Sequence, residues 1–339
     1  MMEIREGLEV YRKRPAPLSW KVPAFCCNDW IALRTLQLCE AVGIGKPFDI
    51  VYGSPRCAWA GGRPSVLSSE LSDEQLDAYF AAYANRGATV ALTLSRLEVD
   101  PGDYANVYCN RILDAAARYR AELILFDDGL ADRIRATHPD LRLVCSLNRA
   151  MSDWKRSSDG MGESGYYRSQ LERYDEIVIR CEFAQSDENL QEISDVADRC
   201  EIIVNQFCVP NCKNVFRHVG SMENWEGEAA AHPCYSMCDA GDIAKRLRGN
   251  LHFSNARIDR FAELGFTKMK LAGRNAPPPK FLEMLSSYVF EPTGVAPFLR
   301  EELSRQFQSA AQSAGGRLLP FWLPEEMELA PVAGMPARG

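Results

Sequence analysis

Short runs of apolar residues alternate along the chain with longer amphipathic segments. Each run is apolar nearly throughout rather than at every second position, which is typical of parallel strands that helices cover. Eight such runs predict the strands Phe48 to Gly53, Ala88 to Leu94, Ala121 to Phe126, Leu141 to Ser146, Asp175 to Arg180, Cys200 to Asn205, Asn250 to Ser254 and Thr267 to Ala272.

The segments between these runs carry apolar residues at helical spacing. The segment from Asp73 to Arg86 is the clearest, with Ser72 in the position of an N-cap and Gly87 after its end. Gly265 follows the last segment in the same way. The other predicted helices are Tyr104 to Arg120, Leu130 to Thr137, Tyr167 to Tyr174, Glu188 to Arg199 and Ala256 to Leu264.

Eight β-α repeats predict an α/β fold, a (β/α)8 barrel of the TIM type. An open, doubly wound sheet is the alternative, but the turn Gly53-Ser54-Pro55-Arg56 lacks the glycine-rich fingerprint that such sheets carry after their first strand. We expect the barrel to cover residues 1–275, with a cysteine-rich insertion at 205–249 after the sixth strand. Residues 276–339 are predicted to form a helical extension and an irregular tail. The predicted helices of this extension are Lys280 to Phe290 and Pro297 to Ala314.

Charge and hydropathy narrow the class of protein. The chain has 39 basic and 46 acidic residues, a net charge of −7, and its one dense basic run is Arg12-Lys13-Arg14. This balance disfavours an electrostatic nucleic-acid binder. No stretch reaches the roughly 18 to 20 apolar residues of a membrane-spanning helix, and the charged start does not resemble a signal peptide. We therefore expect a cytoplasmic protein.

Twelve cysteines are an unusual number for such a chain. Without an export signal, metal ligation or burial is favoured over disulfide bonds. Five of the cysteines lie on predicted helices or in apolar runs, and we interpret them as small buried apolar residues. These are Cys39, Cys109, Cys145, Cys181 and Cys200.

Four other cysteines form two Cys-x3-Cys pairs, Cys208 with Cys212 and Cys234 with Cys238, separated by 21 residues inside the predicted insertion. Four thiolates suit tetrahedral zinc or an iron-sulfur cluster. Structural zinc more often uses Cys-x2-Cys, whose tight turn offers both sulfurs to one small ion. The wider spacing favours a [4Fe-4S] cluster, with zinc as the alternative.

A family resemblance enters at these residues. The run Asn205-x2-Cys208-x3-Cys212, with Arg217-His218 and then Cys234, resembles the signature of the collagenase-like peptidase superfamily, which includes the UbiU/UbiV anaerobic ubiquinone hydroxylation proteins and relatives that hydroxylate RNA bases. The resemblance is sharp over positions 200 to 238. It implies a barrel that holds a [4Fe-4S] cluster and acts in oxygen-independent hydroxylation.

The sequence departs from this signature in one place. Familiar members usually carry Cys-Pro after the second motif cysteine, where Lys213 stands here. The fourth ligand is therefore open between Cys238, Cys57 and none. Transfer of an RNA substrate is also disfavoured, because the chain is acidic.

The predicted barrel brings the loops after the first, sixth and eighth predicted strands to one mouth. This would place Arg63, Arg217, His218 and Arg274 near the cluster. We interpret the arginines as a clamp for a small anionic substrate, with Asn205 as a further substrate-binding residue and Arg217 and His218 as catalytic residues, His218 moving a proton. In the competing interpretation, acids of the mouth neutralise the arginines and the ring is structural. These acids are Asp127, Asp128 and Glu182.

Two functions from different classes remain. The first is an iron-sulfur oxidoreductase of a small-molecule biosynthetic or modification pathway, most concretely an oxygen-independent hydroxylation, supplied with electrons by a partner protein. The second is a barrel stapled by zinc or a structural cluster that binds a metabolite or a partner protein without redox chemistry. Peptide hydrolysis is a weaker third, because the sequence shows neither a nucleophile-His-Asp arrangement nor a His-Glu-x2-His helix.

Overall fold

The strands of the computed structural model close into a barrel. The structure describes residues 18–41, 43, 45–61, 70–157, 160–206, 252–274, 276–290, 301–306 and 308–309. Neighbouring strands are parallel, and the order runs from β1 to β8 with β8 returning to β1. The strands are β1 Ser19–Pro23, β2 Ile50–Gly53, β3 Thr89–Leu94, β4 Glu122–Leu125, β5 Arg142–Cys145, β6 Glu176–Ile179, β7 Cys200–Ile203 and β8 Lys268–Lys270. This confirms the predicted α/β barrel.

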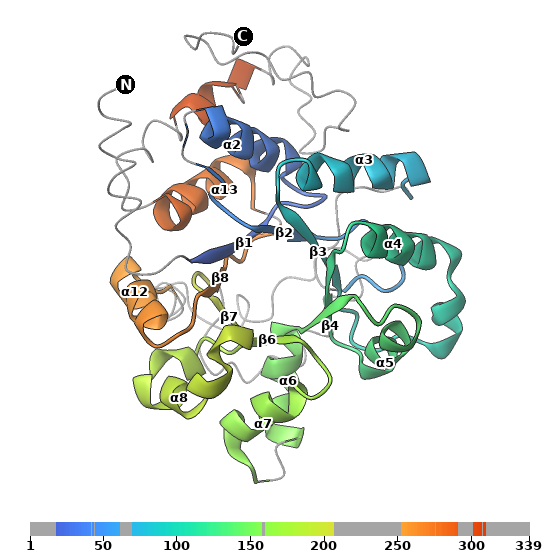
Figure 1. Ribbon diagram of the computed structural model, residues 1–339, viewed down its shortest axis with the longest axis vertical. Coiled ribbons are helices and arrows are strands. Elements are labelled where there is room, and N and C mark those ends of the chain that lie inside the picture. Colours follow the sequence, from blue (N-terminus) through green and yellow to red (C-terminus); the bar gives the residue numbers. More distant parts are fainter. Residues whose placement is uncertain are drawn as a thin grey trace, which may run out of the picture.

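Helices surround the barrel on its outside (Figure 1). The α-helices are α2 Asp29–Ala41, α3 Asp73–Ala84, α4 Val107–Arg118, α5 Asp128–Thr137, α6 Leu147–Ser157, α7 Gly162–Gln170, α8 Asp187–Glu192, α12 Asn255–Glu263 and α13 Pro278–Met284. Shorter turns of other helix types are η1 Pro101–Ala105, η2 Phe183–Gln185, η3 Ser194–Arg199 and η4 Leu285–Val289. Within the described ranges, no helix combines the length and the apolar character that a membrane span requires.

One predicted strand was wrong, and one true strand was missed. The strand expected at Asn250 to Ser254 is absent from the described part of that segment, where His252 makes only an isolated antiparallel bridge to Asn205. The missed strand is β1, whose Lys21 points to charged partners inside the barrel and so breaks the apolar run. The expected insertion therefore follows β7 rather than the sixth strand.

Helix ends follow the signals expected from the sequence. The side chain of Ser72 accepts from the backbone N–H of Gln75, and the side chain of Gln75 accepts from the backbone N–H of Ser72. These two hydrogen bonds form a capping box at the start of α3. Gly87 and Gly265 have φ of +71° and +93°, the left-handed region that favours glycine. The single helix expected from Tyr104 to Arg120 is divided into η1 and α4, because Asn106 caps a new start.

Aromatic packing fixes the loop after β1. The ring of Phe25 contacts those of Tyr79, Phe80 and Tyr83 on α3, with centroids 6.0, 5.3 and 6.1 Å away. The backbone of β2 presses on the same loop, because a Cβ at Gly53 would lie 1.8 Å from the carbonyl oxygen of Phe25. The mouth at this edge is therefore built from tightly packed backbone.

The extension predicted after residue 275 begins with α13 and η4, which contribute the buried side chains of Phe281, Leu282 and Leu285 to the core. Residues 301–306, inside the predicted helix from Pro297 to Ala314, are helical. Residues 310–339, which include the end of that predicted helix and the predicted irregular tail, lie outside the described residues.

Candidate functional site

The cysteine-rich segment leaves and rejoins the barrel at one point. Gln206 is the last described residue after β7, and the chain returns at His252. There, His252 forms the bridge to Asn205, and the backbone N–H of Phe253 donates to the carbonyl oxygen of Val204 at 2.8 Å. Both ends of segment 207–251 are therefore anchored at the carboxyl end of β7, where enzymes with this fold carry their active sites.

Seven of the predicted site residues lie outside the described residues. They are Arg63, Cys208, Cys212, Arg217, His218, Cys234 and Cys238. The structure describes Asn205 and Arg274, and it describes Cys57, the alternative fourth ligand.

Asn205 joins the ends of β7 and β8. Its side chain is buried, with 1% exposure; Oδ1 accepts from the backbone N–H of Ala272 at 2.6 Å, and Nδ2 donates to the carbonyl oxygen of Ala272 at 3.2 Å. Nδ2 also lies 3.2 Å from Sδ of Met284 on α13. The amide thus continues the sheet's hydrogen bonding beyond the strands, and its predicted role in substrate binding would compete with these contacts.

Replacing Asn205 by Ala is expected to lower the free energy of unfolding by about 2 kcal/mol, because two hydrogen bonds to Ala272 are lost in a buried place. Urea denaturation would measure this loss. Asn189→Ala is the control: Asn189 is part-buried, and its amide makes one longer bond, 3.3 Å, to the carbonyl oxygen of Phe183. Equal losses in the two variants would contradict the structural role of Asn205.

Arg274 reaches across the mouth from the loop after β8. Its Nη1 donates to Oγ1 of Thr93, near the end of β3, at 2.6 Å. The Arg274 charge also helps to lower the pKa of Cys27 and of Tyr52, although burial raises the pKa of both groups overall. Arg274 therefore lies among side chains of the β1, β2 and β3 ends, the place expected of a mouth residue.

Other mouth arginines are held by acids. Arg149 donates through Nη2 to Oδ2 of Asp128 at 2.7 Å. Arg180 pairs with Glu163 at 3.1 Å and Glu182 at 3.5 Å. The contacts of Arg149 and Arg180 therefore agree with the interpretation that acids neutralise arginines at the mouth.

Asp127, the third acid offered as a counter-ion, caps α5 by accepting from the backbone N–H of Leu130 at 2.7 Å. Asp128 thus pairs with Arg149, Glu182 pairs with Arg180, and Asp127 binds the backbone at the start of α5.

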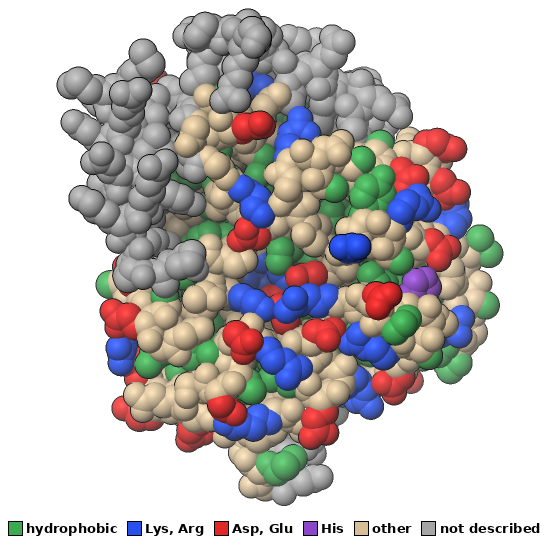
Figure 2. Space-filling view, viewed as in Figure 1, with side chains coloured by type: hydrophobic (Ala, Val, Ile, Leu, Met, Phe, Trp, Pro, Cys, Tyr) green, Lys and Arg blue, Asp and Glu red, His purple; other side chains and the backbone are tan. Residues whose placement is uncertain are grey.

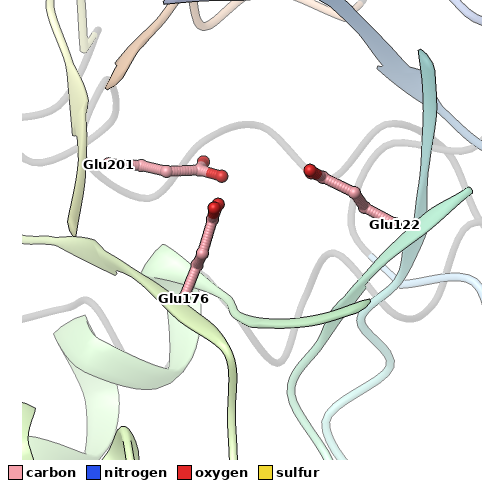
Figure 3. A group of neighbouring side chains, drawn as sticks. All are labelled: Glu122, Glu176 and Glu201. Atoms are coloured by element: carbon pink, nitrogen blue, oxygen red, sulfur yellow. The ribbon is translucent and has the colours of Figure 1, made fainter. Parts of the chain in front are cut away.

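A cluster of charged side chains fills the barrel below this mouth. The sequence analysis did not predict this cluster. We call it the barrel ion cluster. The carboxylates of Glu122, Glu176 and Glu201 come from β4, β6 and β7 and point toward one another inside the barrel (Figure 3). The cationic members are Lys21, Arg142, Lys268 and Lys270.

Lys21 is the centre of the cluster. Its Nζ donates to Oε2 of Glu122 at 2.6 Å and to Oε1 of Glu201, and the whole side chain is buried. Lys270 Nζ lies 3.6 Å from Oε2 of Glu201 and 4.6 Å from the centre of the Tyr52 ring. The three glutamates therefore share their charge with buried ammonium groups.

The outer side of the cluster is closer to the surface. Lys268 and Arg142, with side chains 25% and 49% exposed, both contact Oε1 of Glu176. Basic and acidic side chains are likewise intermixed over the middle of the molecular face in Figure 2. The charges on this part of the protein are thus locally balanced.

Burial and the neighbouring charges shift the protonation of the cluster. Burial favours neutral Glu201, but Lys21 and Lys270 outweigh it and lower the pKa of Glu201 to about 2. Burial, with the Glu201 and Glu122 carboxylates, raises the pKa of Glu176 to about 7. Burial lowers the pKa of Lys270 to about 8 despite Glu201. Glu176 and Lys270 are therefore the members that titrate nearest neutral pH.

The three glutamates invite a comparison with a metal site, because their oxygens lie within 4.8 Å of one another. Hard cations prefer such oxygen ligands. Lys21, however, already places its ammonium group against two of the three, and four cationic side chains face three carboxylates. We interpret the cluster as an ion-paired filling of the barrel rather than a metal centre.

The described cysteines do not form a metal centre of their own. All eight are free and buried, which confirms the interpretation of Cys39, Cys109, Cys145, Cys181 and Cys200. Among the described residues, the glutamate trio is the one group of three or more potential ligands that converge. The thiols of segment 207–251 therefore remain the candidate metal ligands.

Comparisons with known proteins give a distant likeness of fold. No protein-family profile matches the chain, and no curated protein matches it. Among solved structures, the chain is similar to "The Structure of the U32 Peptidase Mk0906", with 12% identity and a TM-score of 0.49 over 78% of this chain and 95% of that one. That neighbour is a member of the collagenase-like peptidase group.

Proposed function

We propose that this protein is a [4Fe-4S]-dependent enzyme that carries out an oxygen-independent hydroxylation, or a related redox step, on a small anionic substrate. The observation that supports this most is the double anchor of segment 207–251 at the carboxyl end of β7. The chain on both sides of the segment that carries the four cysteines therefore lies at the end of the barrel at which this fold performs chemistry.

The donor set fits the cluster chemically. Cys208, Cys212 and Cys234 would hold the iron, with Cys238 as the fourth ligand, since thiolates are the ligands that iron-sulfur clusters require. When bound, such a cluster supplies one-electron transfer, and electrons would come from a partner protein. Cys57, in the loop after β2, is the alternative fourth ligand.

The remaining predicted site residues would bind the substrate and transfer a proton. Arg274 presents a guanidinium group at the mouth, where it would pair with a carboxylate or phosphate of the substrate together with Arg63. His218 would move a proton near neutral pH, with Arg217 beside it in the sequence.

The alternative is a barrel stapled by zinc, or by a purely structural cluster, that binds a metabolite or a partner protein. Anaerobic purification followed by iron and zinc analysis and a visible spectrum separates the two. We expect brown protein with about four iron atoms per chain and little zinc, as one cubane cluster requires. Stoichiometric zinc without iron would favour the alternative.

Changing Arg274 to Lys tests the substrate clamp. Lysine keeps the charge but loses the planar fork, so anion binding is expected to weaken about tenfold while the iron content stays unchanged. Calorimetric titration with inorganic phosphate and with a set of small dicarboxylates would measure this.

Arg96→Lys is the matched control, because Arg96 already bonds Asp103 and the carbonyl oxygen of Ala58. Unchanged anion binding in Arg274→Lys, or an equal loss in Arg96→Lys, would refute the clamp.

A further inference from the structure

Lys270 is a buried lysine at the carboxyl end of a barrel strand. It is the last residue of β8 and is 5% exposed. Its Nζ lies near the Tyr52 ring and near Glu201, whose carboxylate points into the barrel (Figure 3). In this fold, catalytic residues come from the carboxyl ends of the strands. Lys270 is therefore placed both in the barrel ion cluster and at the end of the barrel that bears the mouth.

Lys21 is the neighbour with which Lys270 can be compared, because the two residues pair in register on β1 and β8 and both are buried. The Nζ of Lys21 donates hydrogen bonds to Glu122 and Glu201. The Nζ of Lys270 lies 3.6 Å from Oε2 of Glu201, which is longer than a hydrogen bond. Ion pairing therefore accounts for Lys21. A buried ammonium group held as loosely as that of Lys270 is costly and calls for a further role.

The protonation of the two lysines differs in the same sense. Burial alone would lower the pKa of Lys21, but Glu201 and Glu122 outweigh burial and raise this pKa above its usual value. Burial lowers the pKa of Lys270 to about 8 despite Glu201, and the Lys21 and Arg274 charges act in the same direction as burial. A desolvated amine beside other cations is typical of nucleophilic lysines, because the neutral amine carries the lone pair that attacks. Near neutral pH, Lys270 therefore holds a larger fraction of neutral amine than an exposed lysine does.

The groups around Lys270 suit a molecule with a carbonyl beside a carboxylate. Arg274 follows Lys270 by four residues, and its Nη1 donates to Oγ1 of Thr93 at 2.6 Å across the mouth. The Nζ of Lys270 lies 4.6 Å from the centre of the Tyr52 ring, whose hydroxyl donates to the carbonyl oxygen of Leu271 at 2.6 Å. This ring would stabilise the positive charge of a protonated imine. The end of β8 thus offers an amine for the carbonyl and a guanidinium group for the carboxylate.

We propose that Lys270 binds a small 2-oxo acid covalently as an imine, while Arg274 binds the carboxylate of the same molecule. The lone pair of the neutral amine attacks the carbonyl carbon, and the C–N bond forms as the π bond of the carbonyl breaks. The nitrogen loses one proton and the oxygen gains one, which gives a carbinolamine. The oxygen takes a second proton and leaves as water, the C=N bond forms, and the nitrogen loses its second proton to solvent. In total, one amine and one ketone give one imine and one water.

A 2-oxo acid is one class of the small anionic substrate proposed above, so the inference rests on the proposed function for the anion clamp at Arg274. The imine would hold this substrate at the mouth through a covalent bond as well as an ion pair. Imine formation itself consumes no electrons and requires no metal. The chemistry of Lys270 can therefore be measured independently of the iron content.

The test uses the full-length protein as purified, with pyruvate as the probe. The protein is incubated with pyruvate near neutral pH and treated with sodium borohydride, which adds hydride to the imine carbon and makes the link permanent. It is then digested and analysed by mass spectrometry. We expect one adduct per chain at Lys270, roughly tenfold or more above the labelling of any other lysine, because other lysines are almost fully protonated at this pH.

Two variants on β8 test the position of the amine. Lys270→Arg keeps a positive charge beside Glu201 but forms no imine, so the adduct should disappear. Lys268→Arg is the matched control on the same strand, because Lys268 contacts Glu176, and the adduct at Lys270 should stay unchanged. Circular dichroism checks that both variants fold.

A second probe tests the carboxylate. Acetone has the same carbonyl group as pyruvate but no carboxylate, so it should label Lys270 of the wild-type protein roughly tenfold less, the loss expected for one ion pair to a guanidinium group. Arg274→Gln should remove this preference for pyruvate over acetone.

The proposal is overturned if Lys270 of the wild-type protein stays unmodified, or if the adduct is spread evenly over exposed lysines. Equal labelling by acetone and pyruvate would overturn the 2-oxo acid as the substrate class. These wild-type measurements decide the matter even where a variant fails to fold. Iron analysis of the same sample separates the two proposals: zinc with an adduct at Lys270 contradicts only the proposed function, and a full iron cluster without the adduct contradicts only the role of Lys270.

Discussion

Replacing Lys21 by Met is expected to lower the free energy of unfolding by about 3–5 kcal/mol, the loss typical when one partner of a buried ion pair is removed. Lys21 is buried and bonds both Glu122 and Glu201 inside the barrel. Its removal leaves two carboxylates without their shared ammonium group. Methionine has nearly the same length, so a cavity contributes little to the loss.

Chemical denaturation at neutral pH measures this effect, and Lys268→Met is the control in the same cluster. The side chain of Lys268 is 25% exposed, so water can replace it at Glu176, and a smaller loss is expected. The double change Lys21→Met with Glu201→Gln should recover part of the loss, because one unpaired charge is gone. Equal losses of stability in Lys21→Met and Lys268→Met would show that burial of the charge does not decide the effect. The same would follow if the double variant recovered no stability.

The stability contributed by the cluster should depend on pH, because the pKa of Glu201 is shifted in the folded protein. Lys21 and Lys270 lower the pKa of Glu201 from its usual value of 4.5 to about 2. The stability contributed by this pairing is therefore fully present above about pH 4.5 and is lost as the pH falls toward 2. In Lys21→Met, the loss of stability should begin at higher pH, because the Glu201 pKa rises when its main cation is removed.

Replacing Cys208, Cys212 or Cys234 by Ser should remove most of the iron from the protein, because each would be a direct ligand of the cluster. Iron analysis and the visible spectrum of anaerobically purified variants measure this. Cys145→Ser is the control, since Cys145 is a buried strand residue and should keep the wild-type iron content. Full iron retention in each of the three single variants would refute the proposed ligands.

The fourth ligand is decided by one further comparison. Loss of iron in Cys238→Ser but not in Cys57→Ser supports Cys238. The opposite result would move the ligand to the loop after β2.

The barrel could be predicted because hydrophobic periodicity reports on burial outside the barrel. The side chains of Leu123 and Leu143 pack between strand and helix, and such residues dominate the apolar runs. β1 was missed because its inward residue is Lys21 and it ends at Pro23. The segment before α12 was misread because Phe253 is buried at the end of β7 without joining the barrel.

The ion pairs inside the barrel could not be predicted from the sequence alone. Glu122 and Glu176 open their strands, and alternation places them inside the barrel, so a count of every second residue offered a signal. Which cation each would meet depends on the stagger of the strands, which no local pattern contains.

The antiparallel bridge between Asn205 and His252 makes the segment that it closes modular. Paired residues across a bridge lie about 5 Å apart, a gap that a two-residue hairpin turn spans. A short turn could thus replace residues 207–251 without stretching either β7 or the approach to α12. In evolution and in protein engineering, the barrel and the cysteine-bearing segment are consequently separable parts, and a different segment of almost any length could be exchanged at the same two points.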